Sequence, residues 1–139
     1  MEYLIVVGLA FLVMVPATYF FFNFSKESGE EISFYQFEAI GRSVVDTSES
    51  LFYTGEGSKT VLKVNVPDGI EKAYIIQGRE LVFNVSSSAG YSEILFISRV
   101  NLTTGQDCSS SCLVEALSES GVRSIRIEAL NASVRIGQA

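Results

Sequence analysis

The chain begins with a long apolar run, after which the pattern of apolar and polar residues changes twice. Residues 3–22, "YLIVVGLAFLVMVPATYFFF", contain no charged side chain. A helix of this length, at about 1.5 Å per residue, crosses roughly the 30 Å of hydrocarbon in a bilayer. Backbone groups in lipid must hydrogen-bond within their own segment. The pattern therefore predicts a membrane-length or filament-core helix over residues 3–22, with a kink or an unwound turn at Pro16.

Residues 28–53 show a second pattern, in which one side of a helix is apolar. The apolar residues recur three to five positions apart, which is typical of a helix with one buried face. We expect a second helix or a continuation of the first, ended by the glycine-rich residues 54–58, so that an N-terminal helical domain covers residues 1–53. The predicted buried stripe consists of Ile32, Phe37, Ile40, Val44, Val45 and Leu51.

From Thr60 onward the apolar residues alternate with polar ones, which is typical of β-strands. Five to seven short antiparallel strands should form a β-rich head over residues 58–139, packed on the C-terminal half of the helix, in an α+β fold. Residues 113–120 fit a helical turn or part of a strand. The expected elements are a strand at 60–66 with a turn at 67–69, a hairpin around Gln77-Gly78, a strand at 92–100, and one or two strands within 121–138.

Composition narrows the classes of function. The 139 residues carry a net charge of −6, and the ten Lys and Arg residues are scattered along the sequence without a basic stripe. Nucleic acid is therefore not an expected partner. Histidine, the commonest general base, is absent, and no Ser or Cys stands in a nucleophile-elbow sequence. We expect a protein that is not an enzyme and that holds no metal or cofactor.

Two cysteines, Cys108 and Cys112, lie close together in "DCSSSC". Two sulfurs alone do not complete a tetrahedral zinc site, and three intervening residues differ from the two of a thioredoxin-like motif. We expect a local disulfide, with a pair of free thiols as the alternative. A disulfide indicates an oxidising, extracytoplasmic location. Asn-x-Ser/Thr sequons point the same way, and the glycosylation candidates are Asn84, Asn101, Asn131 and, less favoured beside the apolar run, Asn23.

The opening "MEYLIVVGLAFLV" resembles the N-terminal segment of archaeal type IV pilin-like proteins, which carry a class III signal peptide. In that family a short basic leader is cut before a sequence of the form Q-x-S-x-E-Y-L, and the apolar stretch stays in the mature subunit. Residues 1–4 match the last four positions of that form, so we expect that the leader and the first mature residues precede Met1. Residues 55–85 also resemble the region where the family's long helix gives way to a β-rich head.

The resemblance implies a structural subunit of an archaeal type IV pilus-like surface filament that serves adhesion. The family implies a helical homo-oligomer with the N-terminal helices bundled in its core and the heads outside. The precursor would be membrane-inserted, with prepilin peptidase and the assembly machinery as partners. An archaellin, the subunit of the swimming filament, is a close relative of this class. The alternative from another class is a membrane-anchored extracellular binding module or adhesin whose helix stays in lipid.

The assembly residues that we expect are Glu2, Tyr3, Leu4, Gly8 and Pro16. By resemblance, the terminal amine of a neighbouring subunit neutralises Glu2. The alternative reading of Glu2 is an acid at a helix N-terminus, which the helix dipole stabilises by about 0.3 to 1 kcal/mol. A small residue such as Gly8 lets another helix approach closely.

Overall fold

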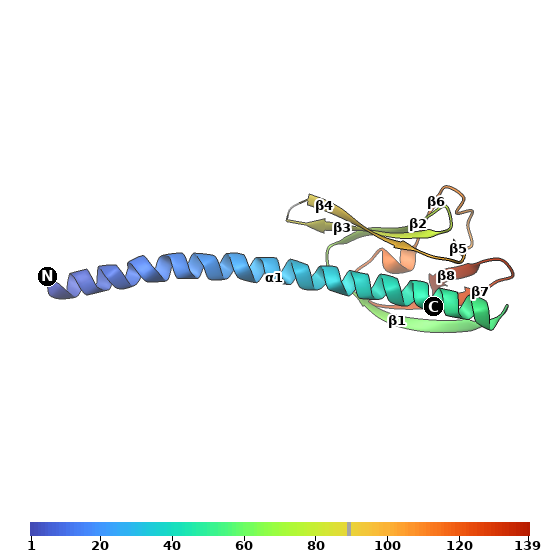
Figure 1. Ribbon diagram of the computed structural model, residues 1–139, viewed down its shortest axis with the longest axis horizontal. Helices are drawn as coiled ribbons and strands as arrows, with labels where there is room; N and C mark the ends of the chain where they lie inside the picture. Colours follow the sequence, from blue (N-terminus) through green and yellow to red (C-terminus); the bar gives the residue numbers. More distant parts are fainter. Residues whose placement is uncertain (89) are drawn as a thin grey trace. The chain divides into compact units, whose positions relative to one another are not determined.

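The computed structural model describes residues 1–88 and 90–139, except for the side chains of residues 26–32. One long helix precedes a β-rich region, as the sequence predicted (Figure 1). The described elements are α1 (Glu2–Thr54), β1 (Lys59–Val66), β2 (Ile70–Ile76), β3 (Glu80–Ser87), β4 (Gly90–Ile97), β5 (Leu102–Thr103), β6 (Ser111–Leu113), the 3₁₀ helix η1 (Glu115–Leu117), β7 (Gly121–Ala129) and β8 (Val134–Gln138).

The chain divides into two compact units, the N-terminal segment (Met1–Ser33) and the head (Phe34–Ala139). Within the N-terminal segment, α1 continues through Pro16 without an interruption, so the unwound turn considered from the sequence is absent there. Proline has no N–H group, so the helix loses one backbone hydrogen bond at this position. The nearby Thr18 hydroxyl donates to the Met14 carbonyl at 2.8 Å, which satisfies the hydroxyl inside the helix.

The head contains two four-stranded sheets. We call them the β1/β7 sheet, with strand order β1-β7-β8-β5, and the β2/β3 sheet, with strand order β4-β3-β2-β6. Neighbouring strands are antiparallel except β5 and β8, which are parallel. The described residues thus contain eight strands where the sequence predicted five to seven, all antiparallel. The difference comes from β5 and β6, which have two and three residues. Runs this short cannot show a recognisable alternation.

Strand β4 is shifted from the predicted range of 92–100. It starts at Gly90 and ends at Ile97 because Ser98 turns the chain. The buried Ser98 hydroxyl donates to the Val100 carbonyl at 2.9 Å and accepts from the Val100 amide at 3.2 Å. Residues 113–120, which the sequence left open, contain both the end of β6 and the 3₁₀ helix η1.

One hydrophobic core joins the C-terminal part of α1 to both sheets. Within the predicted stripe, Phe37, Ile40, Val44 and Val45 are buried and Leu51 is partly buried, whereas the side chain of Ile32 lies outside the described residues. The Phe37 ring lies 6.1 Å from the ring of Phe83 in β3. These contacts confirm that the β-rich region packs on this half of the helix. The inward residues of the β1/β7 sheet are Leu62, Val64, Val66, Ile125, Ile127, Ala129, Val134 and Ile136.

Two turns set the path of the chain through the head. Residues 67–69 form a turn between β1 and β2, as predicted, but the two strands belong to different sheets. The predicted hairpin around Gln77-Gly78 joins β2 to β3, and both residues have positive φ, 52° and 68°. A side chain at Gly78 would also overlap the Asn101 amide oxygen, so glycine fits this turn for two independent reasons.

Candidate functional site

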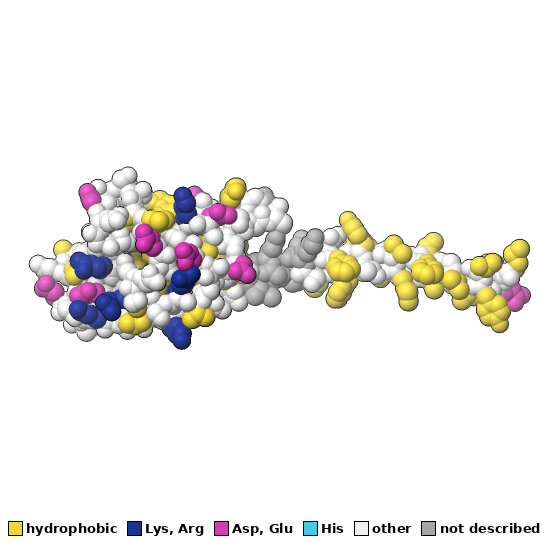
Figure 2. Space-filling view, turned by 180° about the vertical axis from the view of Figure 1, so that it is seen from behind, with side chains coloured by type: hydrophobic (Ala, Val, Ile, Leu, Met, Phe, Trp, Pro, Cys, Tyr) yellow, Lys and Arg dark blue, Asp and Glu magenta, His cyan; other side chains and the backbone are white. Residues whose placement is uncertain are grey.

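The N-terminal segment presents apolar side chains that no other part of this segment covers. Tyr3 and Leu4 are 86% and 72% exposed, and the large apolar side chains that follow as far as Phe24 are at least half exposed. Figure 2 shows hydrophobic side chains along the part of this segment whose side chains the structure describes. Gly8 has open space around its Cα, so a neighbouring helix can approach it closely. The predicted residues Tyr3, Leu4, Gly8 and Pro16 therefore share one helix without contacting a common partner.

The helix from Glu2 to Ser25 is long and apolar enough to cross a membrane, judged by length and composition. Its 24 residues reach a mean hydropathy of 2.4, and none of the apolar window is buried. A membrane anchor and a signal sequence share these properties. The chain therefore carries a helix suited to hydrocarbon surroundings.

Glu2 lies in the first turn of α1 and is exposed. It is the only charged side chain in residues 1–25. Its position favours the carboxylate through the helix dipole. When this end of the helix is surrounded by apolar groups, a carboxylate is costly unless a cation or a hydrogen-bond donor pairs with it. Residues 1–25 contain no cationic side chain for that role.

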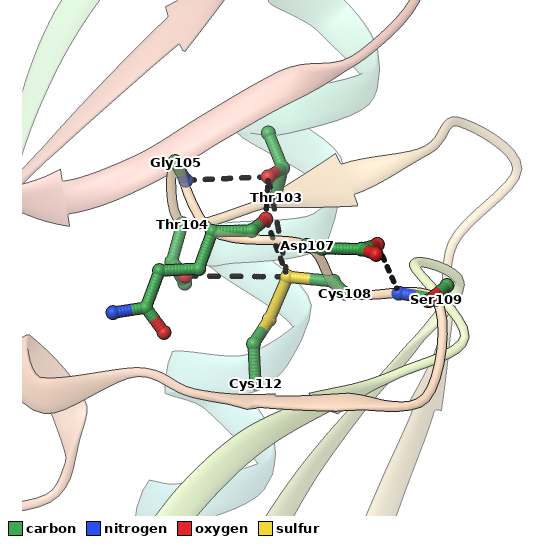
Figure 3. Close-up of a disulfide and its surroundings, with 8 residues drawn as sticks. Thr103, Thr104, Gly105, Asp107, Cys108, Ser109 and Cys112 are labelled. Carbon is green, nitrogen blue, oxygen red and sulfur yellow. Dashed lines mark hydrogen bonds between the residues drawn. A yellow bond between two sulfur atoms is a disulfide. The ribbon is translucent and has the colours of Figure 1, made fainter.

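A disulfide joins Cys108 and Cys112, whose Cα atoms lie 5.0 Å apart (Figure 3). The hydroxyls of Thr103 and Thr104 lie 3.9 and 4.0 Å from Cys108 Sγ. The bond closes a very short loop, so the chain-entropy estimate of its stabilisation is about 2 kcal/mol. It ties the loop between β5 and β6, which holds Cys108, to strand β6, which holds Cys112. No group of three His, Cys, Asp or Glu suited to a metal occurs among the described residues.

The sequons differ in their surroundings. Asn131 is exposed in the connection between β7 and β8, and Asn101 is exposed just before β5. Asn84 instead lies in the middle of β3, and its Oδ1 atom is buried without a hydrogen-bond partner among the described atoms. Asn23 is exposed on α1 within the apolar helix. Among the three sequons of the head, Asn101 and Asn131 are therefore the more accessible positions.

The structure gathers basic residues that are scattered in the sequence. We define the basic face as Lys59, Lys63, Arg126 and Arg135 on the solvent side of the β1/β7 sheet. Register places Arg126 opposite Val61 and places Glu128 between Lys59 and Arg135. Figure 2 shows several Lys and Arg side chains toward the lower side of the head, with acidic side chains among them and further basic side chains higher on the same view. The sequence did not reveal this face, although the alternation of Lys59, Val61 and Lys63 along one strand was an available signal.

The opposite sheet carries an apolar row on its solvent side. We define the apolar row as Leu113, Tyr74, Val82 and Leu95, one residue from each strand in direct register. The Tyr74 hydroxyl donates to Glu93 Oε1 at 3.0 Å, so this pair bridges β2 and β4 over β3. The Tyr74–Glu93 bridge accounts for the low exposure of Val82, which is only 1% exposed although it lies on the solvent side of the sheet. Burial, together with the hydrogen bond to Glu93, raises the pKa of Tyr74 above its ordinary value.

Comparisons of the chain with protein-family models, with curated proteins and with solved structures found no match.

Proposed function

We propose that this chain is the structural subunit of a type IV pilus-like surface filament of the archaeal kind, polymerising through its apolar N-terminal helix. The observation that carries the proposal is the apolar surface of the helix from Glu2 to Ser25, of which no residue in the apolar window is buried. A surface of this size on a protein requires lipid or another protein. In a filament, each helix exchanges contacts with lipid for contacts with its neighbours. Adhesion is the proposed role of the filament.

Glu2 supports packing between copies over permanent residence in lipid. Glu2 is the only charged side chain in residues 1–25, and a carboxylate needs a partner when apolar groups surround it. Residues 1–25 contain no Lys or Arg, so no side chain among them can form an ion pair with Glu2. A neighbouring subunit's terminal amine fits the requirement and would also fix the axial register between subunits.

Electron microscopy of the native material tests this proposal. We expect filaments from the unmodified chain and loss of filaments from Glu2→Gln, which keeps the size of the side chain but removes its charge. Glu56→Gln is the matched control because Glu56 is exposed in the turn after α1 and should leave assembly unchanged. Dispersed single subunits in detergent, with no filaments from the unmodified chain, would overturn the proposal.

A membrane-anchored binding module is the second candidate, because the helix satisfies the length and composition of a membrane span. Under this function the helix stays in lipid and Glu2 has no assembly role. Surface display of Glu2→Gln on intact cells would then equal that of the unmodified chain, and no filament would be visible for either. The same pair of variants therefore separates the two functions.

A further inference from the structure

We propose that the two outer faces of the head bind each other between copies, with the basic face of one subunit seated on the apolar row and its flanking carboxylates in the next. The inference rests on the proposed assembly of copies and specifies a contact that the apolar helices do not make. It joins two different surfaces, so it is a heterologous contact, which repeats from subunit to subunit without closing into a pair.

The basic face supplies unpaired positive charge around small apolar side chains. Lys59 pairs with Glu128 at 3.1 Å within the sheet. In the part of the chain that the structure describes, Lys63, Arg126 and Arg135 have no carboxylate within 4.0 Å, so their charges are free for a partner. Strand register sets these three residues on a diagonal across β1, β7 and β8. Val61 and Val122 are 56% and 62% exposed on the same side.

The β2/β3 sheet presents the complementary chemistry. Glu80 and Glu93 flank the apolar row on its solvent side, against one lysine, Lys72. Leu95 in the row and Ile97 beside Glu80 are exposed. Carboxylates around apolar side chains on one face thus match cations around valines on the other. Such matching favours the correct docking orientation and disfavours pairing of like faces.

The area that the contact between heads can bury limits its strength. Even four full strands about 4.8 Å apart and roughly 20 Å long would give a face of at most roughly 400 Å², or about 800 Å² for both partners together, and one strand of each sheet is much shorter. Stable pairwise complexes bury about 1,200–2,000 Å². The contact is therefore too small to hold two heads together alone. It would orient heads that the apolar helices have already brought side by side.

Zero-length carbodiimide cross-linking of native-length chains tests the contact, because it joins a lysine amine to a carboxylate only when the two groups touch. Isotopically labelled and unlabelled chains are mixed before assembly, and cross-linked peptides are identified by mass spectrometry. We expect Lys63 joined to Glu80 or Glu93 in peptides that combine one labelled and one unlabelled chain. Lys59 joined to Glu128 within a single chain is the internal control for the reaction.

Two variants test the charges. Lys63→Glu should abolish the mixed-isotope peptides from this position, and the double exchange Lys63→Glu/Glu80→Lys should recover a mixed-isotope link between the two positions. Both variants change exposed or half-exposed side chains, and retention of the Lys59–Glu128 link verifies that the sheet is folded.

The outcomes for this contact differ from those for filament formation. Filaments without mixed-isotope links between these faces would overturn the contact and leave the filament proposal intact. Mixed-isotope links without filaments would support the contact and contradict the filament. If neither appears while the internal control reacts, the contact is also overturned.

Discussion

At the scale of single residues, the chemistry of Tyr74 depends on a neighbour that sequence distance conceals. Tyr74 and Glu93 are 19 positions apart, and only the pairing of β2, β3 and β4 brings the hydroxyl to the carboxylate. Burial and this carboxylate both disfavour the tyrosinate form. Sequence reasoning located the hairpin that contains Tyr74 but had no means of finding the partner across the sheet.

The raised pKa of Tyr74 predicts a dependence of stability on pH. In the unfolded chain the phenol loses its proton near pH 10, whereas the folded chain holds the proton to a higher pH. The stabilisation that protonated Tyr74 gives to the folded state is therefore fully present below about pH 10. It is lost as the pH rises through the pKa of Tyr74 in the folded chain. We expect the free energy of unfolding, measured in urea from pH 8 to 11, to fall more steeply for the unmodified chain than for Tyr74→Phe.

Tyr53→Phe is the control for this measurement because Tyr53 is 73% exposed. Its curve should follow that of the unmodified chain, because the substitution removes one hydroxyl from an exposed side chain. All titratable groups apart from Tyr74 itself are common to the unmodified chain and Tyr74→Phe. If the free energies of unfolding of Tyr74→Phe and of the unmodified chain fell in parallel above pH 10, the raised pKa of Tyr74 would be contradicted.

At the scale of elements, sequence periodicity predicted most of what the structure shows. The apolar stripe located the buried face of α1, and alternation located β1, β3 and β7, while the range that holds β7 and β8 was predicted to contain one or two strands. The missed features are those that periodicity cannot encode. These are the two shortest strands, the parallel pairing of β5 with β8, and the division of the strands into two sheets. The basic face was missed for the same reason, because it exists only after β1, β7 and β8 pair.

Packing between α1 and β4 at Gly41 gives a prediction at this scale. A Cβ atom at Gly41 would overlap the Phe96 ring, which itself packs edge-on against Phe83 at 5.8 Å. Gly41→Leu should lower the free energy of unfolding by about 1–3 kcal/mol, because overpacked sites force side chains and backbone to move. Chemical denaturation measures the change. Ala39→Leu, at an exposed position of the same helix, should change it by less than about 0.5 kcal/mol.

A double-mutant cycle then identifies the partner of Gly41. In the Phe96→Ala background the leucine gains room, so Gly41→Leu should cost less than it does in the unmodified chain. Residues in contact typically show coupling of about 0.5–3 kcal/mol. If the two substitutions changed the free energy of unfolding additively, α1 would contact β4 in a different way from the packing of Gly41 on Phe96.

At the scale of the whole molecule, each surface has a different proposed role. The N-terminal segment offers uncovered apolar surface, the two sheets offer complementary outer faces, and the ends of the strands carry the exposed sequons. These roles constrain one another. In a filament, a bulky modification fits only where no neighbouring subunit packs.

Glycan positions test this arrangement. Asn84 lies in register between Lys72 and Glu93 on the outer side of the β2/β3 sheet, inside the proposed contact between heads. Asn101 and Asn131 lie outside the paired strands, before β5 and between β7 and β8. Peptide mass spectrometry of native subunits should therefore find added hexose-type mass both on the peptide containing Asn101 and on the peptide containing Asn131, and an unmodified peptide containing Asn84.

Removal of each sequon provides the matched comparison. Asn131→Gln and Asn101→Gln should each lower the mass of the native subunit by that of a glycan, whereas Asn84→Gln should leave the glycan mass unchanged. A bulky sugar at the centre of a sheet face would hold a second subunit away from Glu93 and the apolar row. A glycan found on Asn84 in assembled filaments would therefore exclude the proposed contact between heads, while filaments built through the apolar helices would remain compatible with it.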